Sequence, residues 1–527
     1  NNMSYNLTTM QSIYHNQDEI VEITYNNSPV YQKGGPTPTY DIRYTTTNNQ
    51  KLTLPSESAV ASHDFINGNG YITLNANTAV PYQFFYGCTT LQKVYYSTGV
   101  TFDAQGYQHE ICRSLDYVEL PSDLTALPTY CFKGCISLCE ITLPSTVASL
   151  GDFAFYVCGV NNHNLGYYQP DVKFTSSTVP TASGINAFLT EPAVSGVTAY
   201  NTIYKLVPYE SYPDYCVDSN WITSNNYIDW YDDDATDYSA IPFYVENTTD
   251  NVEHVSIRYP APRNISYSDD RINWTRFDMT QGFDLPAHSR KYIWTDDAAA
   301  ATEQKGIYGM DTVGGNLNTF YGIAPVNGVA QTTAASDVNL SRLFLVDNSD
   351  SSSNTTLVDA RNLILDYVYR SHDEYNRTFK KCTALVYAPK RIYINPNSEQ
   401  QCFVRAFEEC SSLTHMPKLP STAIPYSTHW NAFHSCTSLA ASTALPAATH
   451  TAGSNSESYE SMFENCISMR YIKILTDPAD PNAAQGTNNF TKTINAGNGV
   501  FVKKVGATWP TGANGIPSGW TVLEATE

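Results

Sequence analysis

One four-residue word recurs at regular spacing along this chain of 527 residues. A cysteine stands three residues before a leucine or methionine in CTTL, CRSL, CISL, CTAL, CSSL, CTSL and CISM. Counting Cys158, whose following residues depart from the pattern, the gaps are 24, 23 and 23 residues in a first group and 28, 26 and 30 in a second. Such spacings are repeat periods, so the chain must stack similar units on one another. The eight cysteines are Cys88, Cys112, Cys135, Cys158, Cys382, Cys410, Cys436 and Cys466.

Apolar residues keep a fixed register around these cysteines. A phenylalanine precedes the cysteine by three residues in every unit except one, where His109 takes its place. An alternating apolar stretch that ends in Leu-Pro follows, and the stretches that begin at Leu115 and Leu138 match position by position. Periods of about 20 to 29 residues with leucine or isoleucine at fixed offsets are typical of leucine-rich repeats. Each coil of such a repeat buries its apolar edge only against its neighbours, so function is expected on the exposed faces.

The full unit, F-x-x-C-x-x-L-x-x-I-x-L-P, resembles the BspA-like leucine-rich repeats of secreted bacterial proteins. The stretch IYKLVPYESYPDYCVDSNWI, residues 203–222, is similar to the segment that closes such arrays. The resemblance implies a first leucine-rich solenoid over residues 51–228. It also implies adhesion or recognition rather than catalysis.

The sequence changes character after the first group of cysteines. From about residue 240, short alternating segments are broken by Pro, Asn and Asp-Asp turns, which is typical of an antiparallel β-sandwich. The portion ISYSDDRINWTRF resembles a β-domain in surface and phage-encoded proteins of gut bacteria, which leads into degenerate leucine-rich repeats. AFEECSSLTHMPKLPSTAI and MFENCISMRYIKIL match those repeats, and WPTGANGIPSGW resembles the family's ending. There we expect Trp509 and Trp520 to belong to the core of a cap.

The first 50 residues alternate around N-Q-D and N-N-S turns and predict two small hairpins. They are similar to the opening segments of phage tail and virion proteins. The predicted fold is therefore a β-rich mixed α/β chain with two leucine-rich-repeat solenoids, an antiparallel β-sandwich between them and small β modules at both ends. Its parts are an N-terminal β-hairpin module (1–50), the first solenoid (51–228), the β-sandwich (229–345), the second solenoid (346–480) and a C-terminal β cap (481–527).

The regular cysteines predict a column of thiols inside the stacked coils. Equivalent residues on successive coils lie about 4.8 Å apart, but a disulfide needs converging Cβ atoms, whereas side chains in a column point the same way. We therefore interpret these cysteines as buried groups that pack like small hydrophobic side chains. The pairing of Cys216 and Cys402, which lie outside the register, stays open. The alternative is a zinc site at Cys131, Cys135 and Cys139 near His109, although C-x3-C-x3-C differs from the usual paired spacing.

The most conspicuous polar cluster is NNYIDWYDDDATDYSAI, residues 225–241. Its carboxylates could bind Ca²⁺ and its rings could stack on a sugar, but the residue order of an EF-hand loop is absent. We favour a solvated acidic linker between the first solenoid and the sandwich. The candidate ligand residues are Trp230, Tyr231, Asp232, Asp233 and Asp234.

Composition and motifs limit the class of function. The 51 acidic and 30 basic residues give a net charge of −21, which repels a phosphate backbone, so we expect no nucleic-acid partner. No run approaches the roughly 18 apolar residues of a membrane helix, so we expect no membrane insertion. The sequence contains no G-x-S-x-G, H-E-x-x-H or phosphate loop. We therefore expect no enzyme, no metal and no cofactor.

Tyrosine-rich outer faces suit binding by surface contact, because aromatic rings supply large area at low entropic cost. We expect a non-enzymatic, extracellular recognition protein at the surface of a phage virion, as a tail or head fibre component that binds the host bacterial envelope. The alternative is an adhesin on the bacterial cell surface that binds a host protein or glycan. The expected partners are an envelope glycan or protein and other virion or surface proteins, and a fibre role is compatible with a homo-oligomer.

Overall fold

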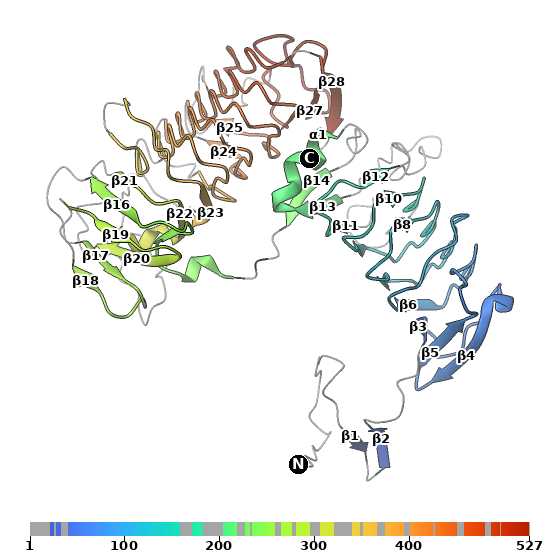
Figure 1. Cartoon of the computed structure of the whole chain (residues 1–527). Coiled ribbons are helices and arrows are strands. Elements are labelled where there is room, and N and C mark those ends of the chain that lie inside the picture. The colour runs from blue at the N-terminus through green and yellow to red at the C-terminus, as the bar shows by residue number, and fades with distance from the viewer. Residues whose placement is uncertain are drawn as a thin grey trace.

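The structure, a computed structural model, consists almost entirely of strands and turns (Figure 1), which confirms the predicted β-rich class. In the part of the chain that the structure describes, the one α-helix is α1 (Tyr212–Val217), and no helix is long and apolar enough to span a bilayer. The described residues are 22–25, 28–32, 40–156, 158, 171–182, 204–218, 227–231, 234, 236–258, 265–276, 281–295, 306–320, 340–347, 351–365, 375–394, 401–424, 427–450, 458–479, 486–495 and 497–525.

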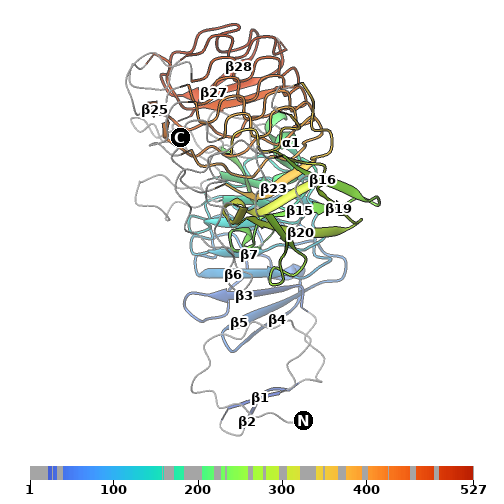
Figure 2. The same ribbon diagram turned by 90° about the vertical axis from the view of Figure 1, so that its left-hand side faces the viewer.

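A first stack of coils occupies residues 80–231. Its main strands run parallel, and buried residues pair across them, as Val94 with Val118 and Ile141 with Val172. Three antiparallel strands extend the sheet at the start of the stack (Figure 2). The main strands are β6 (Leu91–Tyr96), β7 (Tyr117–Glu119), β9 (Glu140–Leu143), β11 (Asp171–Phe174), β13 (Tyr204–Pro208) and β14 (Tyr227–Tyr231).

The antiparallel extension contains β3 (Ile42–Thr46), β4 (Val60–Ile66) and β5 (Asn69–Leu74). Strand β3 pairs with both β5 and β6, although it precedes the domain boundary predicted at residue 50. A shorter parallel ladder of the same coils contains β8 (Ala126–Leu127), β10 (Ser149–Leu150) and β12 (Thr181–Ala182). Near the N-terminus, β1 (Glu22–Tyr25) and β2 (Ser28–Gln32) form one antiparallel hairpin.

An antiparallel module follows the first stack and contains two sheets, in the orders β18-β17-β20-β15-β22-β23 and β19-β16-β21. Strand β22 pairs in parallel with β23, which belongs to the next stack, so the module and that stack share a sheet and one hydrophobic core. The strands are β15 (Tyr244–Asn247), β16 (Glu253–Arg258), β17 (Ile265–Ser268), β18 (Thr275–Arg276), β19 (Phe283–Leu285), β20 (Ser289–Thr295), β21 (Gly306–Tyr308), β22 (Thr312–Asn316) and β23 (Asp359–Ile364).

A second stack occupies residues 340–525. Isolated parallel bridges, such as Tyr387 with His415, join its coils. At its far end Trp509 and Trp520 are both buried, and their indole N–H groups donate to the carbonyls of Thr476 and Asn495 at 3.0 Å. Its strands after β23 are β24 (Ala423–Ile424), β25 (Thr449–His450), β26 (Tyr471–Ile474), β27 (Val500–Lys504) and β28 (Thr521–Ala525).

The F-x-x-C turn joins each coil to the next. Phe407 N–H donates to the carbonyl of Ala432 at 2.8 Å, and Glu409 N–H donates to that of His434 at 2.8 Å. A positive φ angle recurs at every fourth residue of the turn, at Gln401 (66°), Arg405 (55°) and Glu409 (64°). The turn therefore forms a backbone hydrogen-bond ladder of its own beside the parallel sheet.

The eight regular cysteines line the inside of these turns and are all buried. The Cys436 thiol donates to the carbonyl of Phe407 in the preceding coil at 3.1 Å, and this carbonyl also accepts the N–H of Cys410. Seven of the eight thiols make this bond to the residue at the phenylalanine position, over 2.8 to 3.7 Å. Cys88, in the first coil, lies 3.9 Å from the Thr53 carbonyl instead. All twelve cysteines of the chain are thiols.

The phenylalanines form a second column beside the sulfur atoms. In the second stack the rings of Phe379 and Phe407 lie 4.9 Å apart and almost parallel. The column begins one coil earlier than the regular cysteines, at Phe344, whose ring lies 4.8 Å from that of Phe379. In the first stack His109 takes a place in the column, 4.7 Å from the ring of Phe132. Ring stacking and thiol hydrogen bonds thus hold the same turns together.

The burial of the thiols predicts that they react slowly with thiol reagents in the native protein. Burial raises the pKa of Cys88 to about 11 and that of Cys466 to about 12, so little reactive thiolate forms at neutral pH. We expect Ellman's reagent to react first with the half-buried Cys139 in the native protein, and with all twelve cysteines after denaturation without reductant. A count below twelve in the denatured protein would show that some cysteines are oxidised.

His109 predicts an acid-sensitive contribution to stability. It is fully buried, its Nε2 lies 2.7 Å from Tyr96 Oη, and burial lowers its pKa to about 3. The unfolded chain takes up the proton near pH 6.5 and the folded chain does not. Acidification from pH 6.5 to 3 should therefore destabilise the native state by up to about 1.4 kcal/mol per pH unit.

Two variants isolate this effect in urea unfolding at several pH values. The change His109→Phe should cost about 1–3 kcal/mol at pH 7, because it leaves the buried Tyr96 hydroxyl without its partner. The double variant Tyr96→Phe/His109→Phe should recover most of that loss and lack the His109 share of the acid dependence. An acid dependence equal to that of the wild type would contradict this role.

Candidate functional site

The sheet of the first stack presents an outward face of alternating tyrosines and charged residues. Inward residues such as Val118 are buried, whereas the neighbouring Tyr117 is 43% exposed. The Arg43 guanidinium lies 3.9 Å above the ring of Tyr95, and the rings of Tyr95 and Tyr117 are 5.3 Å apart. The ammonium group of Lys93 lies 6.0 Å from the ring of Tyr117. These contacts fix the rings as a continuous aromatic surface across β3, β6 and β7.

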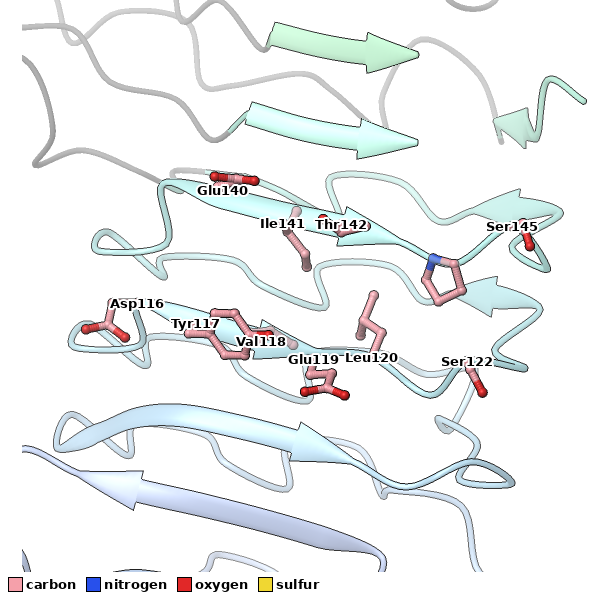
Figure 3. Close-up of a pocket in the computed structure, with 11 residues that line it drawn as sticks. Asp116, Tyr117, Val118, Glu119, Leu120, Ser122, Glu140, Ile141, Thr142 and Ser145 are labelled. Atoms are coloured by element: carbon pink, nitrogen blue, oxygen red, sulfur yellow. The ribbon is translucent and has the colours of Figure 1, made fainter. Parts of the chain in front are cut away.

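A hollow of about 530 Å³ opens beside Tyr117, between β7 and β9 (Figure 3). Strand β7 is the last strand of one sheet and β9 the first of the next, so the parallel ladder is interrupted there. Flanking contacts still hold the two coils together, since Ser137 Oγ donates to the Arg113 carbonyl at 2.7 Å and Thr146 Oγ1 to the Ser122 carbonyl at 3.1 Å. The hollow is therefore a local opening within a continuous stack.

The lining of this hollow suits binding of polar groups. Three exposed carboxylates surround it, from Asp116 and Glu119 beside Tyr117 and from Glu140 on β9 (Figure 3). None of its eleven lining residues is a lysine, arginine, histidine or cysteine. Carboxylates accept hydrogen bonds from hydroxyl or ammonium groups, and an exposed aromatic ring packs against an apolar or cationic group. The lining therefore combines acceptors for polar groups with an exposed aromatic ring, which are features of a binding surface.

The described residues of the aromatic and acidic cluster predicted at residues 225–241 lie in two separate places, a strand and a local turn. Trp230 and Tyr231 lie in β14, which pairs with β13, so this part is a strand rather than the solvated linker that its composition suggested. Tyr231 Oη donates to the Phe174 carbonyl at 2.7 Å, and the ring of Trp230 lies 4.8 Å from that of Tyr209. Both rings are therefore structural.

Asp234 lies in a separate local turn. It accepts hydrogen bonds from Thr236 N–H at 3.0 Å and from Tyr238 Oη at 2.6 Å, and these bonds lower its pKa to about 2. Asp232 and Asp233 lie outside the described residues. Among the described residues, no group of three histidine, cysteine, aspartate or glutamate side chains could hold a metal ion.

The sulfur atoms considered for zinc have separate neighbours. Cys131 Sγ lies 3.8 Å from His109 Nδ1, Cys135 donates to the His109 carbonyl at 3.1 Å, and Cys139 donates to the Ser137 carbonyl at 3.2 Å. The two cysteines outside the register are also buried: Cys402 Sγ lies 3.9 Å from Thr428 Oγ1, and Cys216 lies near Tyr212. These sulfur atoms contribute to packing within the coils.

The residues that form the exposed aromatic face were not among the residues selected from sequence. A signal was present, since LQKVYY and LDYVEL place Tyr95 and Tyr117 between the buried positions of two successive units. Tyr71 on β5, whose ring lies 5.2 Å from that of Tyr40, adds to the same face from the antiparallel extension.

Two segments of the chain, residues 70–169 and 375–480, match the family described as BspA type leucine-rich repeat region, in six copies. None of the curated proteins matches the chain significantly. A leucine-rich repeat protein of Bacteroides ovatus is 16% identical over 79% of both chains, with a TM-score of 0.18. A leucine-rich cell surface protein of Faecalibacterium prausnitzii is 14% identical over 79% of this chain and 86% of its own, with a TM-score of 0.16. TM-scores this low do not establish a shared arrangement of the whole chain.

The exposure of Tyr117 predicts that its ring contributes little to folding. Tyr86, in a turn of the same stack, is also 43% exposed and serves as a matched control. Each change to alanine should lower the free energy of unfolding by less than about 1 kcal/mol, the range of substitutions on exposed surfaces and in exposed ring pairs. Urea unfolding measures both values, and a clearly larger loss at Tyr117 would assign its ring a structural role.

Proposed function

We propose that this chain, whose residues 70–169 and 375–480 match the BspA-type leucine-rich repeat region, is a non-enzymatic surface-recognition protein. In this proposal, two solenoids separated by a β-sandwich form a rigid carrier for a binding face. The observation that carries the proposal is the exposed face of β3, β6, β7 and β9, with its aromatic surface and its carboxylate-lined hollow beside Tyr117.

The face has the physical properties of a recognition surface. Its rings are held by neighbouring charged groups before any partner arrives, so binding need not order them, and little conformational entropy is lost. The carboxylates of Asp116, Glu119 and Glu140 supply hydrogen-bond acceptors around the exposed ring of Tyr117. Such a mixture of aromatic area and polar groups suits a glycan or a protein.

We assign this activity to contact with a bacterial envelope, as part of a phage virion fibre. The similarity of the N-terminal segment and of the β-domain to virion and phage-encoded proteins supports this assignment. Antibody labelling of phage particles and of bacterial cells in electron micrographs distinguishes it from an adhesin on the bacterial cell surface. Label on particles is expected, whereas label confined to cells would overturn the virion assignment and leave surface recognition in place.

The binding role predicts a specific loss in one variant. Binding of the purified chain to isolated envelopes or to an array of bacterial glycans should weaken by about tenfold or more for Tyr117→Ala, because aromatic anchors commonly carry binding energy. The matched variant Tyr86→Ala should bind as the wild type does. Equal binding by all three proteins would exclude this face as the recognition surface, and turnover of a polysaccharide would overturn the non-enzymatic role.

A further inference from the structure

The outward side of the sheet in the second stack is covered at β26 (Tyr471–Ile474). All four residues of β26 are buried, although alternate residues of a strand point to opposite sides. Ile472 and Ile474 belong to the core of the second stack. Tyr471 belongs instead to the hydrophobic cluster of the first stack. A segment of the first stack therefore packs on this outward face.

The segment that covers it is the end of the first stack, of which the structure describes residues 204–218 and 227–231, with α1 and β14 (Figure 1); we call these residues the closing segment. Tyr212 and Cys216 of the closing segment belong to the same hydrophobic cluster as Tyr471. That cluster also contains other outward residues from the last coils of the second stack. Tyr212 and Cys216 are both 5% exposed or less. The outward residues in that cluster are Ala441, Tyr471, Leu475, Val502 and Ala525.

Aromatic contacts continue the interface toward β23. Tyr209 is 3% exposed, and its ring lies 4.8 Å from that of His415 and 6.1 Å from that of Tyr387. Its hydroxyl donates to the carbonyl of Ala388 at 3.4 Å. Further along, Tyr212 Oη donates to the carbonyl of Ser442 at 3.0 Å. The buried tyrosine hydroxyls are thus satisfied by backbone carbonyls of the second stack.

Charged groups across the interface are complementary. Glu210 of the closing segment pairs with Arg361 of the second stack at 2.7 Å, and His415 Nε2 donates to the Glu210 carbonyl at 3.1 Å. Asp229 pairs with Lys418 at 2.6 Å, and the same ammonium group lies 4.1 Å from the ring of Trp230. The carboxylates come from the closing segment and the cations from the second stack.

We infer that the outward face of the second stack is a docking surface for a protein segment rich in tyrosine and carboxylate, and that its occupant is the chain's own closing segment. The docked closing segment holds the two stacks as one bent body. It also occupies the face that, by analogy with the first stack, would otherwise be free to bind a ligand. Recognition by the outward sheet faces is then confined to the first stack, and a competing partner would need the same tyrosine and carboxylate chemistry.

Removal of the two tyrosines that reach across the interface tests this inference. We expect Tyr209→Ala/Tyr212→Ala to open the full-length chain, with a larger radius of gyration in small-angle X-ray scattering and faster proteolysis between the stacks. Tyr95→Ala/Tyr117→Ala removes as many rings from the exposed face and should leave both measurements unchanged. Circular dichroism checks that the strands of each variant are retained.

A charge exchange tests the pairing without removing apolar area. Lys418→Asp places a carboxylate against Asp229 and should also increase the radius of gyration, whereas Asp229→Lys/Lys418→Asp should restore the compact form. Lys492→Asp is the control, because Lys492 pairs with Glu464 inside the second stack at 2.9 Å. The inference fails if neither the tyrosine pair nor Lys418→Asp expands the chain. The inference is also contradicted if Asp229→Lys/Lys418→Asp has a radius of gyration as large as that of Lys418→Asp.

Discussion

The stacking of each coil on its neighbour is the constraint on which the rest of the structure depends, and seven of the eight regular thiols contribute to it by donating to a carbonyl of the preceding coil. The carbonyl at the phenylalanine position already accepts an N–H within its own turn, and the sulfur of the next coil supplies a second donor. A thiol suits this position because it is small and apolar and still donates weakly, so its burial costs less than that of a hydroxyl. Seven of the eight regular cysteines thus connect coils without any covalent bond between them.

The sequence predicted this part of the fold well, because the repeat is local and its register can be counted. The resemblance to BspA-type repeats and the β-rich class are confirmed. The repeat pattern did not identify Phe344, because this residue lies 35 residues before Phe379 and the repeat period of the second group is shorter. Its ring nevertheless stacks in the same column. Trp230 and Tyr231 were misassigned to a linker because acidic composition says nothing about a strand partner, which here is β13.

The exposed aromatic face shows a second limit of sequence reasoning. Alternation identifies the outward positions on both sheets, so Tyr117 and Tyr471 look equivalent from their local patterns. Only Tyr117 is exposed, because the closing segment covers Tyr471 through contacts such as that of Tyr212 with Ser442, separated by 230 residues. No periodicity encodes a contact of this kind. The location of a binding face therefore depends on long-range packing, even where the repeats themselves are evident.

This packing also changes the mechanics of the repeats. In an isolated stack each coil contacts only its neighbours, so small rotations add up along its length and the outer face bends with them. The closing segment contacts several coils of the second stack at once, from Ala388 to Ser442. Those coils can no longer rotate independently without breaking tyrosine and carboxylate contacts. The first stack is then anchored at its closing end, while the opposite end, with Tyr95 and Tyr117, stays uncovered for a partner.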